Sequence, residues 1–321
     1  MIKTSILDDF IDYLKTAKGL SEKTCREYYY DIRTFMRFIY KRKIDPTIED
    51  EDIDIDEVDE EVLKSITKRD FYAYMGHLAN GMNNSAKTRY RKNSSVRTFF
   101  KYLKDVLEII DENPALDIEM PKIDKSLPIY LTLDECMSLL TAVRNYKQKK
   151  VYEMRDYAII TLFLNTGMRL SELVGINIKD IRKDDTLRVI GKGNKDRTIY
   201  LNDACRSAID EYLKLRPQVE TDALFLSSHE NRISNRAVQK LVEKHLNNAG
   251  LDSDRYSVHK LRHTAATLMY QYGNADILAL KEILGHESVA TTQIYTHINS
   301  DVLRSAVENN PLSEVKINKK E

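Results

Sequence analysis

Five short segments in the second half of the chain carry side chains suited to phosphate chemistry. They supply Arg169, Lys192, the pair His259 and Arg262, and then His286 and Tyr295. Cleavage of a phosphodiester without a metal needs a nucleophile, cations that bind the non-bridging oxygens, and an acid that protonates the leaving oxygen. The six residues include a candidate for each of these roles.

Arg169 and Lys192 are the first two candidate cations. Arg169 lies between Gly167 and the run L-S-E-L, where one helix should end and the next begin, and its planar fork can bind a phosphate. The simpler alternative is a surface arginine paired with Glu172. Lys192 stands between two glycines, which let a backbone approach a ligand closely, although lysines at hairpin tips often serve solubility. The segment lacks the G-x-x-x-x-G-K-[ST] spacing, so it does not predict a nucleotide-binding loop.

The segment S-V-H-K-L-R-H concentrates His259, Arg262 and His263 at the start of a predicted helix. His259 and Arg262 are three residues apart and share one helix face. His263 could instead be a core histidine, or His259 and His263 could bind a metal. Zinc peptidases of this spacing carry H-E-x-x-H, whereas this chain has the cation Lys260 in the second position, which disfavours a metal.

His286 and Tyr295 complete the set. His286 follows a predicted helix end in L-G-H-E-S, and Tyr295 comes nine residues later in T-T-Q-I-Y-T-H. By itself Tyr295 would be read as a packed aromatic, since the chain has 19 tyrosines.

Helices and one hairpin are expected to position these residues. Apolar periodicity, caps and glycine stops predict helices over about 153–165, 257–272 and 276–284, and another that begins at Thr132 with Glu135 in a capping box. The alternating segments around G-K-G-N-K predict a β-hairpin. The second half should therefore be mostly helical with a small antiparallel sheet.

The first half shows helical periodicity throughout about 110 residues, with Ser21 as a candidate N-cap. Three prolines between Asn113 and Pro128 interrupt the periodicity and predict a linker. We therefore expect a mainly α (α+β) protein with a helical domain over 1–118, a linker over 119–128 and a second domain over 129–321.

The formal net charge of zero hides an uneven distribution. Eleven acids and no base lie between Asp45 and Glu61; without them the first 124 residues hold 21 Lys and Arg against 14 Asp and Glu. Like-charge repulsion predicts that the acidic stretch 49–61 is a solvated spacer loop. A chain shortened between Asp50 and Glu60 should then still fold.

A basic segment from Asn83 to Lys104 interleaves seven Lys and Arg with four aromatic residues. This composition fits a helix that binds DNA, and fits equally an amphipathic helix whose aromatics face the core. The candidate DNA-binding residues are Lys87, Arg89, Arg91, Lys92 and Arg97.

Other features exclude several classes of protein. Three widely spaced cysteines argue against a disulfide framework or a C-x-x-C metal site. No stretch approaches the roughly 18 apolar residues of a membrane span, and the N-terminus lacks the apolar run of a signal peptide, so we expect a cytoplasmic protein.

Five segments together resemble the tyrosine recombinase (phage integrase) family, and the Xer-type site-specific recombinases in particular. They are T-G-M-R-L-S-E-L, G-K-G-N-K-D-R, H-K-L-R-H, L-G-H-E-S and T-T-Q-I-Y-T-H, in the order of the family and close to its spacing. The resemblance extends to the N-terminal helices, which are similar to the core-binding domain of the family. The acidic stretch is a departure that lengthens this domain.

The resemblance implies that Tyr295 is the nucleophile that forms a 3′-phosphotyrosine and frees a 5′-hydroxyl. It implies that Arg169 and Arg262 form the arginine pair, that Lys192 is the hairpin lysine, and that His259 and His286 are the two histidines. Neither a cofactor nor a metal is implied.

The partners implied are double-stranded DNA at a specific site, three further subunits in a homotetramer or a heterotetramer with a paralogous recombinase, and a DNA translocase. Chromosome dimer resolution, within chromosome partition and cell division, is the expected role. The alternatives are the integrase of a mobile element, a relaxase similar to type IB topoisomerases, and a DNA-binding regulator without activity.

Overall fold

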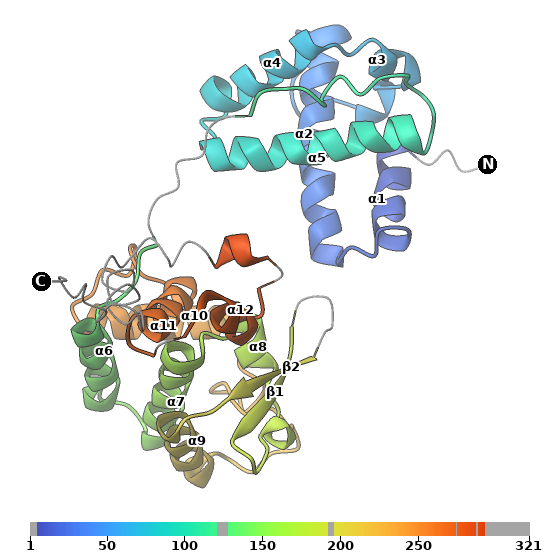
Figure 1. Ribbon diagram of the computed structural model, residues 1–321. Coiled ribbons are helices and arrows are strands. Elements are labelled where there is room, and N and C mark those ends of the chain that lie inside the picture. The colour runs from blue at the N-terminus through green and yellow to red at the C-terminus, as the bar shows by residue number, and fades with distance from the viewer. Residues whose placement is uncertain (1–4, 121–127, 192–195, 274, 287, 293–321) are drawn as a thin grey trace, which may run out of the picture. The chain divides into compact units, whose positions relative to one another are not determined.

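The computed structural model describes residues 5–120, 128–191, 196–273, 275–286 and 288–292. The chain divides into two compact units, residues 1–125 and 126–321 (Figure 1). The described elements are helices and one two-stranded antiparallel sheet, which confirms the predicted mainly helical fold class. None of the described helices combines the length and the apolar composition that a membrane crossing requires.

The first unit is helical. Its described elements are α1 (Ile6–Thr16), α2 (Glu22–Lys43), the 3₁₀ turn η1 (Ile55–Glu57), α3 (Glu60–Lys64), α4 (Lys68–Gly76), the π-helical turn η2 (His77–Gly81) and α5 (Ala86–Asp105). Ser21 caps α2 through its side chain, as predicted. Packed aromatic rings fill the core, and Phe35 of α2 stacks on Phe71 of α4 with 5.3 Å between ring centroids.

Helices α2 and α5 cross and pack against each other (Figure 1). A buried carboxylate joins them, because Asp31 of α2 accepts hydrogen bonds from Arg91, from Lys92 at 3.2 Å and from Ser95 at 2.7 Å, all on α5. A buried carboxylate needs partners of this kind, since desolvation disfavours its charge.

The acidic stretch is folded into this unit, which corrects the prediction of a solvated spacer loop. Ile53 and Val58 are buried in the core of the first unit. The hydroxyl of Tyr40 donates to Glu57 at 2.8 Å, and α3 begins at Glu60. The carboxylates remain at the surface while the few apolar residues among them anchor the segment.

The second unit carries the predicted chemistry. Its described elements are α6 (Leu133–Asn145), α7 (Lys150–Thr166), α8 (Leu170–Gly175), the 3₁₀ turn η3 (Ile178–Asp180), β1 (Thr186–Ile190), β2 (Asp196–Tyr200), α9 (Asp203–Leu215), α10 (Asn235–Asn248), α11 (Val258–Tyr272), α12 (Ile277–Leu284) and the 3₁₀ turn η5 (Val289–Thr291). The capping box of Thr132 and Glu135 is present, and β1 pairs with β2 in the predicted hairpin, with Val189 opposite Arg197.

Helix α7 forms the centre of this unit. It packs against α6, α9 and α11, and most of its residues are buried. From Ala158 to Leu164 the helix is buried on all sides, as expected of a central core helix. Its C-terminus at Gly167 therefore lies in a fixed position next to the start of α8.

A second buried carboxylate fixes α10 to α7. Asp156 of α7 accepts hydrogen bonds from Arg155, from Lys244 at 3.3 Å and shares one with His245 at 3.0 Å. Burial alone would raise the pKa of Asp156, but the His245 hydrogen bond and the nearby cations outweigh it and hold the pKa below its usual value.

Candidate active site

Arg169 is the N-cap residue of α8, as the sequence predicted. Its backbone N–H donates to Oε2 of Glu172 at 2.6 Å, and its Nη1 donates to Oε1 of the same carboxylate at 2.9 Å. Its Nη2 donates to the carbonyl of Gly285 at 2.6 Å. Arg169 therefore forms the ion pair with Glu172 that the simpler alternative predicted. The Glu172 side chain is fully buried, so this is not a pair between two surface residues, and the carboxylate helps to orient Arg169.

Arg262 lies on the first turns of α11 and is buried. Its Nη1 donates to the carbonyl of Gly167 at 2.6 Å, and its Nη2 donates to the carbonyl of Leu284 at 2.7 Å. These carbonyls stand at the C-terminal ends of α7 and α12, where helices leave acceptors unsatisfied and favour positive charge. The guanidinium is thus held rigidly by two helix ends.

Glu172 and Arg197 are functional candidates that the sequence analysis did not single out. Arg197 of β2 donates two hydrogen bonds to the Glu172 carboxylate, from Nε at 3.1 Å and from Nη2 at 2.8 Å. Burial would raise the pKa of Glu172, yet the bonds and charges of Arg197 and Arg169 outweigh it, so the pKa lies below its usual value. The Glu172 carboxylate is therefore ionised and hydrogen-bonded by two arginines.

Two histidines of the site are neutral at physiological pH. Burial, followed by the charges of Arg262 and Arg169, lowers the pKa of His286 to about 4. Burial, followed by the charge of His259, lowers the pKa of His263 to about 4 as well. The Nδ1 atom of His286 shares a hydrogen bond with the Thr292 hydroxyl at 2.9 Å.

The histidines of α11 differ in exposure. His259 is exposed, whereas His263 is half-buried, and their rings meet edge to face with centroids 4.6 Å apart. Among the residues that the structure describes, no group of three or more His, Cys, Asp or Glu side chains is placed to hold a metal ion.

Two glycines make the close packing of the site possible. Gly167 and Gly285 have φ of +60° and +63°, the left-handed conformation that ends many helices. A Cβ at Gly167 would lie 2.7 Å from Cδ2 of Leu284, and one at Gly285 would lie 3.0 Å from Cδ of Arg197. Both predicted helix stops therefore also let α7, α12 and β2 approach one another.

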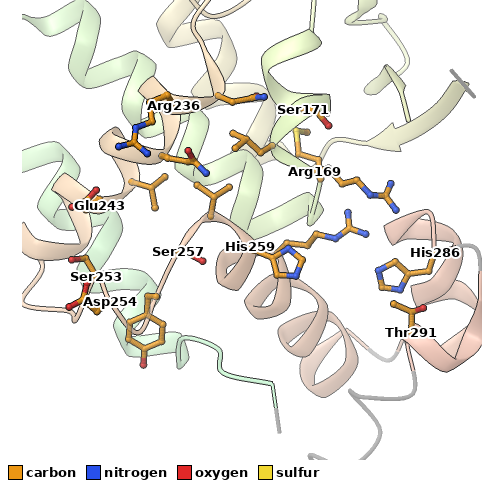
Figure 2. Close-up of a pocket in the computed structure, with 18 residues that line it drawn as sticks. Arg169, Ser171, Arg236, Glu243, Ser253, Asp254, Ser257, His259, His286 and Thr291 are labelled. Carbon is orange, nitrogen blue, oxygen red and sulfur yellow. The ribbon is translucent and has the colours of Figure 1, made fainter. Parts of the chain in front are cut away.

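One cavity of about 800 Å³ brings several predicted catalytic residues together. Arg169, His259, Arg262 and His286 all contribute to its wall, and Figure 2 shows Arg169, His259 and His286 close together at one end. Arg236 of α10 lines the other end of the cavity in the same view. Four of the six predicted catalytic residues are thus gathered from three separate segments of the chain.

The other two predicted catalytic residues, Lys192 and Tyr295, lie outside the described residues. The described strands β1 and β2 flank the segment that contains Lys192. The catalytic roles assigned to all six residues remain predictions.

The predicted DNA-binding residues of α5 fall into two groups. Lys87 and Arg91 are exposed and Arg89 is half-buried. By contrast, Lys92 is buried against Asp31, and Nε of Arg97 donates to the carbonyl of Ala115 at 2.8 Å. The cationic groups of Lys92 and Arg97 therefore have partners inside the first unit. Arg91, which pairs with Asp31, and Arg89, which donates to the Asn84 carbonyl at 3.1 Å, have partners there too, although Arg91 is exposed.

The aromatic residues of the same segment are divided in a similar way. Phe99, Phe100 and Tyr102 are buried in the core of the first unit, whereas Tyr90 is exposed. Of the two interpretations of this helix, the amphipathic one accounts for most of its aromatics.

Both units match known protein families. Residues 130–301 match the Phage integrase family, and residues 6–108 match the Phage integrase, N-terminal SAM-like domain. A tyrosine recombinase XerC of Caldanaerobacter subterraneus subsp. tengcongensis is 49% identical and is aligned over 96% of this chain and 87% of that protein. A tyrosine recombinase XerC of Pelobacter propionicus is 35% identical over 91% of this chain and 90% of that protein.

Solved structures share the fold. A XerH site-specific recombinase bound to a palindromic difH substrate superposes with a TM-score of 0.71, covering 94% of this chain and 83% of that one at 22% identity. At that identity the likeness concerns the fold alone. The family matches and the 49% identical relative show the class of protein: a DNA strand transferase of the tyrosine recombinase type. The chain belongs to the phage integrase family, within which it is a Xer-type site-specific tyrosine recombinase.

Proposed function

We propose that this recombinase cleaves and rejoins DNA with Tyr295 as the nucleophile and that it resolves chromosome dimers. Tyr295 attacks a backbone phosphate in line, which gives a 3′-phosphotyrosyl enzyme and a free 5′-hydroxyl. The bond energy is retained in the ester, so a 5′-hydroxyl of the partner duplex can displace the tyrosine. The exchange then passes through a Holliday junction and consumes no ATP.

The observation that carries this proposal is the convergence of Arg169, Arg262 and His286 on one cavity. Both guanidinium groups are fixed by helix-end carbonyls before substrate arrives. Preorganised cations of this kind stabilise the charge that develops on the non-bridging oxygens, and one such contact can contribute about 3 kcal/mol.

The histidines have complementary roles in the proposal. The Thr292 hydroxyl engages Nδ1 of His286, which leaves Nε2 to bond the phosphate. A neutral His286 donates one proton in a hydrogen bond without adding charge, while His259 shares the proton of the tyrosine. Lys192 protonates the leaving 5′-oxygen.

DNA and three further subunits are the proposed partners, because exchange between two duplexes requires four strand cleavages. The tetramer contains this chain alone or this chain with a paralogous recombinase, and a DNA translocase activates it. The action on the chromosome implies a cytoplasmic location. The two relatives named tyrosine recombinase XerC support this role over that of a mobile-element integrase.

Tyr295→Phe tests the nucleophile. The variant should bind DNA as the parent does and form no covalent complex on a nicked suicide substrate, because Phe keeps the ring and lacks the reacting oxygen. Folding should survive, since one lost hydroxyl costs about 1 kcal/mol. Covalent attachment of the Tyr295→Phe protein would overturn the proposal.

Lys192→Ala tests the general acid independently. Cleavage of ordinary DNA should slow, whereas DNA with a bridging 5′-sulfur should be cleaved at nearly the parent rate, because sulfur departs without protonation. An equal defect on both substrates would remove Lys192 from this role.

A further inference from the structure

The C-terminal end of α12 is capped by three arginines from three different elements. Consecutive backbone carbonyls each accept a hydrogen bond from one of them: Ile283 from Arg197 of β2, Leu284 from Arg262 of α11, and Gly285 from Arg169 at the start of α8. The last carbonyls of a helix lack partners within the helix and carry partial negative charge. His286 follows this capped end directly, so its position depends on all three hydrogen bonds.

Arg197 differs from the other two arginines in its surroundings. Its side chain is only 14% exposed, and each of its three nitrogens has a protein partner. Two of them hold both oxygens of Glu172, and the third binds the carbonyl of Ile283. A guanidinium engaged in this way is suited to hold other groups rather than to bind a phosphate itself.

Arg197 and Arg169 share the buried carboxylate of Glu172. That carboxylate accepts from the backbone N–H of Arg169 at 2.6 Å and from its Nη1 at 2.9 Å. Without Arg197, Glu172 would be balanced by Arg169 alone, and the carboxylate would neutralise more of the positive charge of Arg169. The carbonyl of Ile283 would also be left without its partner.

We propose that Arg197 is a positioning residue for strand cleavage, which links β2, the buried Glu172 and the end of α12 so that Arg169 and His286 meet the phosphate in a fixed arrangement. This inference rests on the proposed function. It assigns Arg197 no contact with DNA; its effect on the reaction passes through Glu172 and the carbonyl of Ile283.

The hairpin itself offers a matched control. Arg188 of β1 also pairs with a carboxylate through two nitrogens, to Asp196 at 3.0 and 2.6 Å, but both side chains are about half exposed. Replacing Arg188 removes an arginine and an ion pair from the same hairpin without touching Glu172 or α12. An exposed pair of this kind contributes little to stability.

The experiment compares Arg197→Gln, Arg197→Lys and Arg188→Gln in single-turnover cleavage of a suicide substrate, with DNA affinity and thermal unfolding measured on the same proteins. Arg197→Gln should cleave roughly 10- to 100-fold more slowly, the usual cost of removing an outer partner of a reacting group. Its affinity for DNA should stay within about 2-fold of the parent, because Arg197 binds no phosphate. Arg197→Lys should be intermediate, since an ammonium cannot hold both oxygens of a carboxylate. Arg188→Gln should match the parent.

A double variant shows whether Arg197 acts through Glu172. Glu172→Gln removes the negative charge that Arg197 balances, so adding Arg197→Gln to Glu172→Gln should cost much less than Arg197→Gln costs alone. Additive losses would overturn the inference, as would parent-like cleavage by Arg197→Gln or an equal defect in Arg188→Gln. If Arg197→Gln unfolds, the comparison is made with Arg197→Lys, whose parent-like cleavage rate would also contradict the inference.

Failure of this inference and failure of the proposed function are distinguishable. Parent-like cleavage by the Arg197 variants, with Tyr295→Phe inactive, removes only the positioning role. Covalent attachment of Tyr295→Phe would remove the mechanism regardless of Arg197.

Discussion

At the scale of single residues, predicted catalytic groups also serve as hydrogen-bond donors to helix ends. The carbonyls that end α7 and α12 need donors, and Arg262 satisfies one from each. The same hydrogen bonds fix the guanidinium before DNA arrives, so no reorganisation is required during the reaction. The same two hydrogen bonds therefore stabilise the helix ends and preorganise the Arg262 guanidinium.

Gly167→Ala should destabilise the second unit by roughly 1–3 kcal/mol, the usual cost of a side chain in the left-handed region. The added methyl would also lie 2.7 Å from Leu284. Gly175→Ala is the control, because Gly175 has no heavy atom within 4 Å of the added Cβ and no positive φ. Urea unfolding followed by circular dichroism should separate the two variants, and equal midpoints would contradict this account.

The lowered pKa values of His263 and His286 predict that the protein loses stability in mild acid. Both have a pKa lowered from 6.5 to about 4, so between these values the unfolded chain binds protons that the folded chain does not. The free energy of unfolding should therefore fall as the pH drops from about 6.5 and level off near 4. Glu172 and Asp156, whose pKa values are lowered, add their loss only at the acid end of this range and below.

Urea unfolding at pH 7, 5.5 and 4.5 measures this effect. The double variant His263→Gln/His286→Gln should lose less stability over that range than the parent, because it no longer carries the two shifted groups. A decline of equal steepness in both proteins would show that other residues cause it.

At the scale of elements, features that depend on residues close in sequence could be predicted, whereas contacts between distant segments could not. The capping box at Thr132, the glycine stop at Gly167 and the β-hairpin each depend on residues close in sequence, and the structure confirms them. The burial of Glu172 depends on β2 and could not follow from a three-residue spacing to Arg169. The motif G-K-G-N-K-D-R did contain Arg197, but nothing local indicated its distant partners.

The acidic segment shows the same limit. Its eleven carboxylates between Asp45 and Glu61 suggested a solvated loop, yet isolated apolar residues interrupt the charges without regular spacing, and two of these, Ile53 and Val58, are buried. Charge composition predicted the exposure of the carboxylates correctly. The isolated apolar residues were the signal that the segment also packs.

Ile53→Ala and Val58→Ala should each destabilise the first unit, with Ile53→Ala costing about 2 kcal/mol or more because a buried side chain is truncated to a methyl. Glu51→Ala and Asp52→Ala are the controls, since both acids are exposed and should change stability by less than about 0.5 kcal/mol. Scanning calorimetry of the full chain reports the effect. A deletion from Asp50 to Glu60 that folds as the parent does would contradict this role for the segment.

At the scale of the whole molecule, the second compact unit carries the predicted catalytic residues, and we propose that the first adds affinity for DNA. The zero net charge of the chain is misleading because the acidic segment offsets an excess of Lys and Arg in the rest of the sequence. Local distribution of charge, rather than the sum, governs association with a polyanion. Lys92 and Arg97 also show that a count of basic residues overstates the cations available to DNA, since both are engaged inside the first unit.

The salt dependence of DNA binding tests the proposed contribution of the first unit. Replacing Lys87, Arg89 and Arg91 by Ala should weaken binding to every DNA sequence and reduce the slope of log affinity against log salt concentration. The slope should fall by about 0.9 for each phosphate that the variant no longer binds, because each bound phosphate releases condensed counterions. Lys64→Ala is the control for the loss of one exposed cation from the same unit; like Arg91, this lysine pairs with a carboxylate, Glu61, at 3.1 Å. Because Arg91 also pairs with the buried Asp31, thermal unfolding must first show that the triple variant is folded at the assay temperature. A folded triple variant with parent-like affinity and slope would exclude this face of α5 from the DNA interface. A loss in Lys64→Ala equal to one third of the triple variant's loss would reduce the effect to net charge alone.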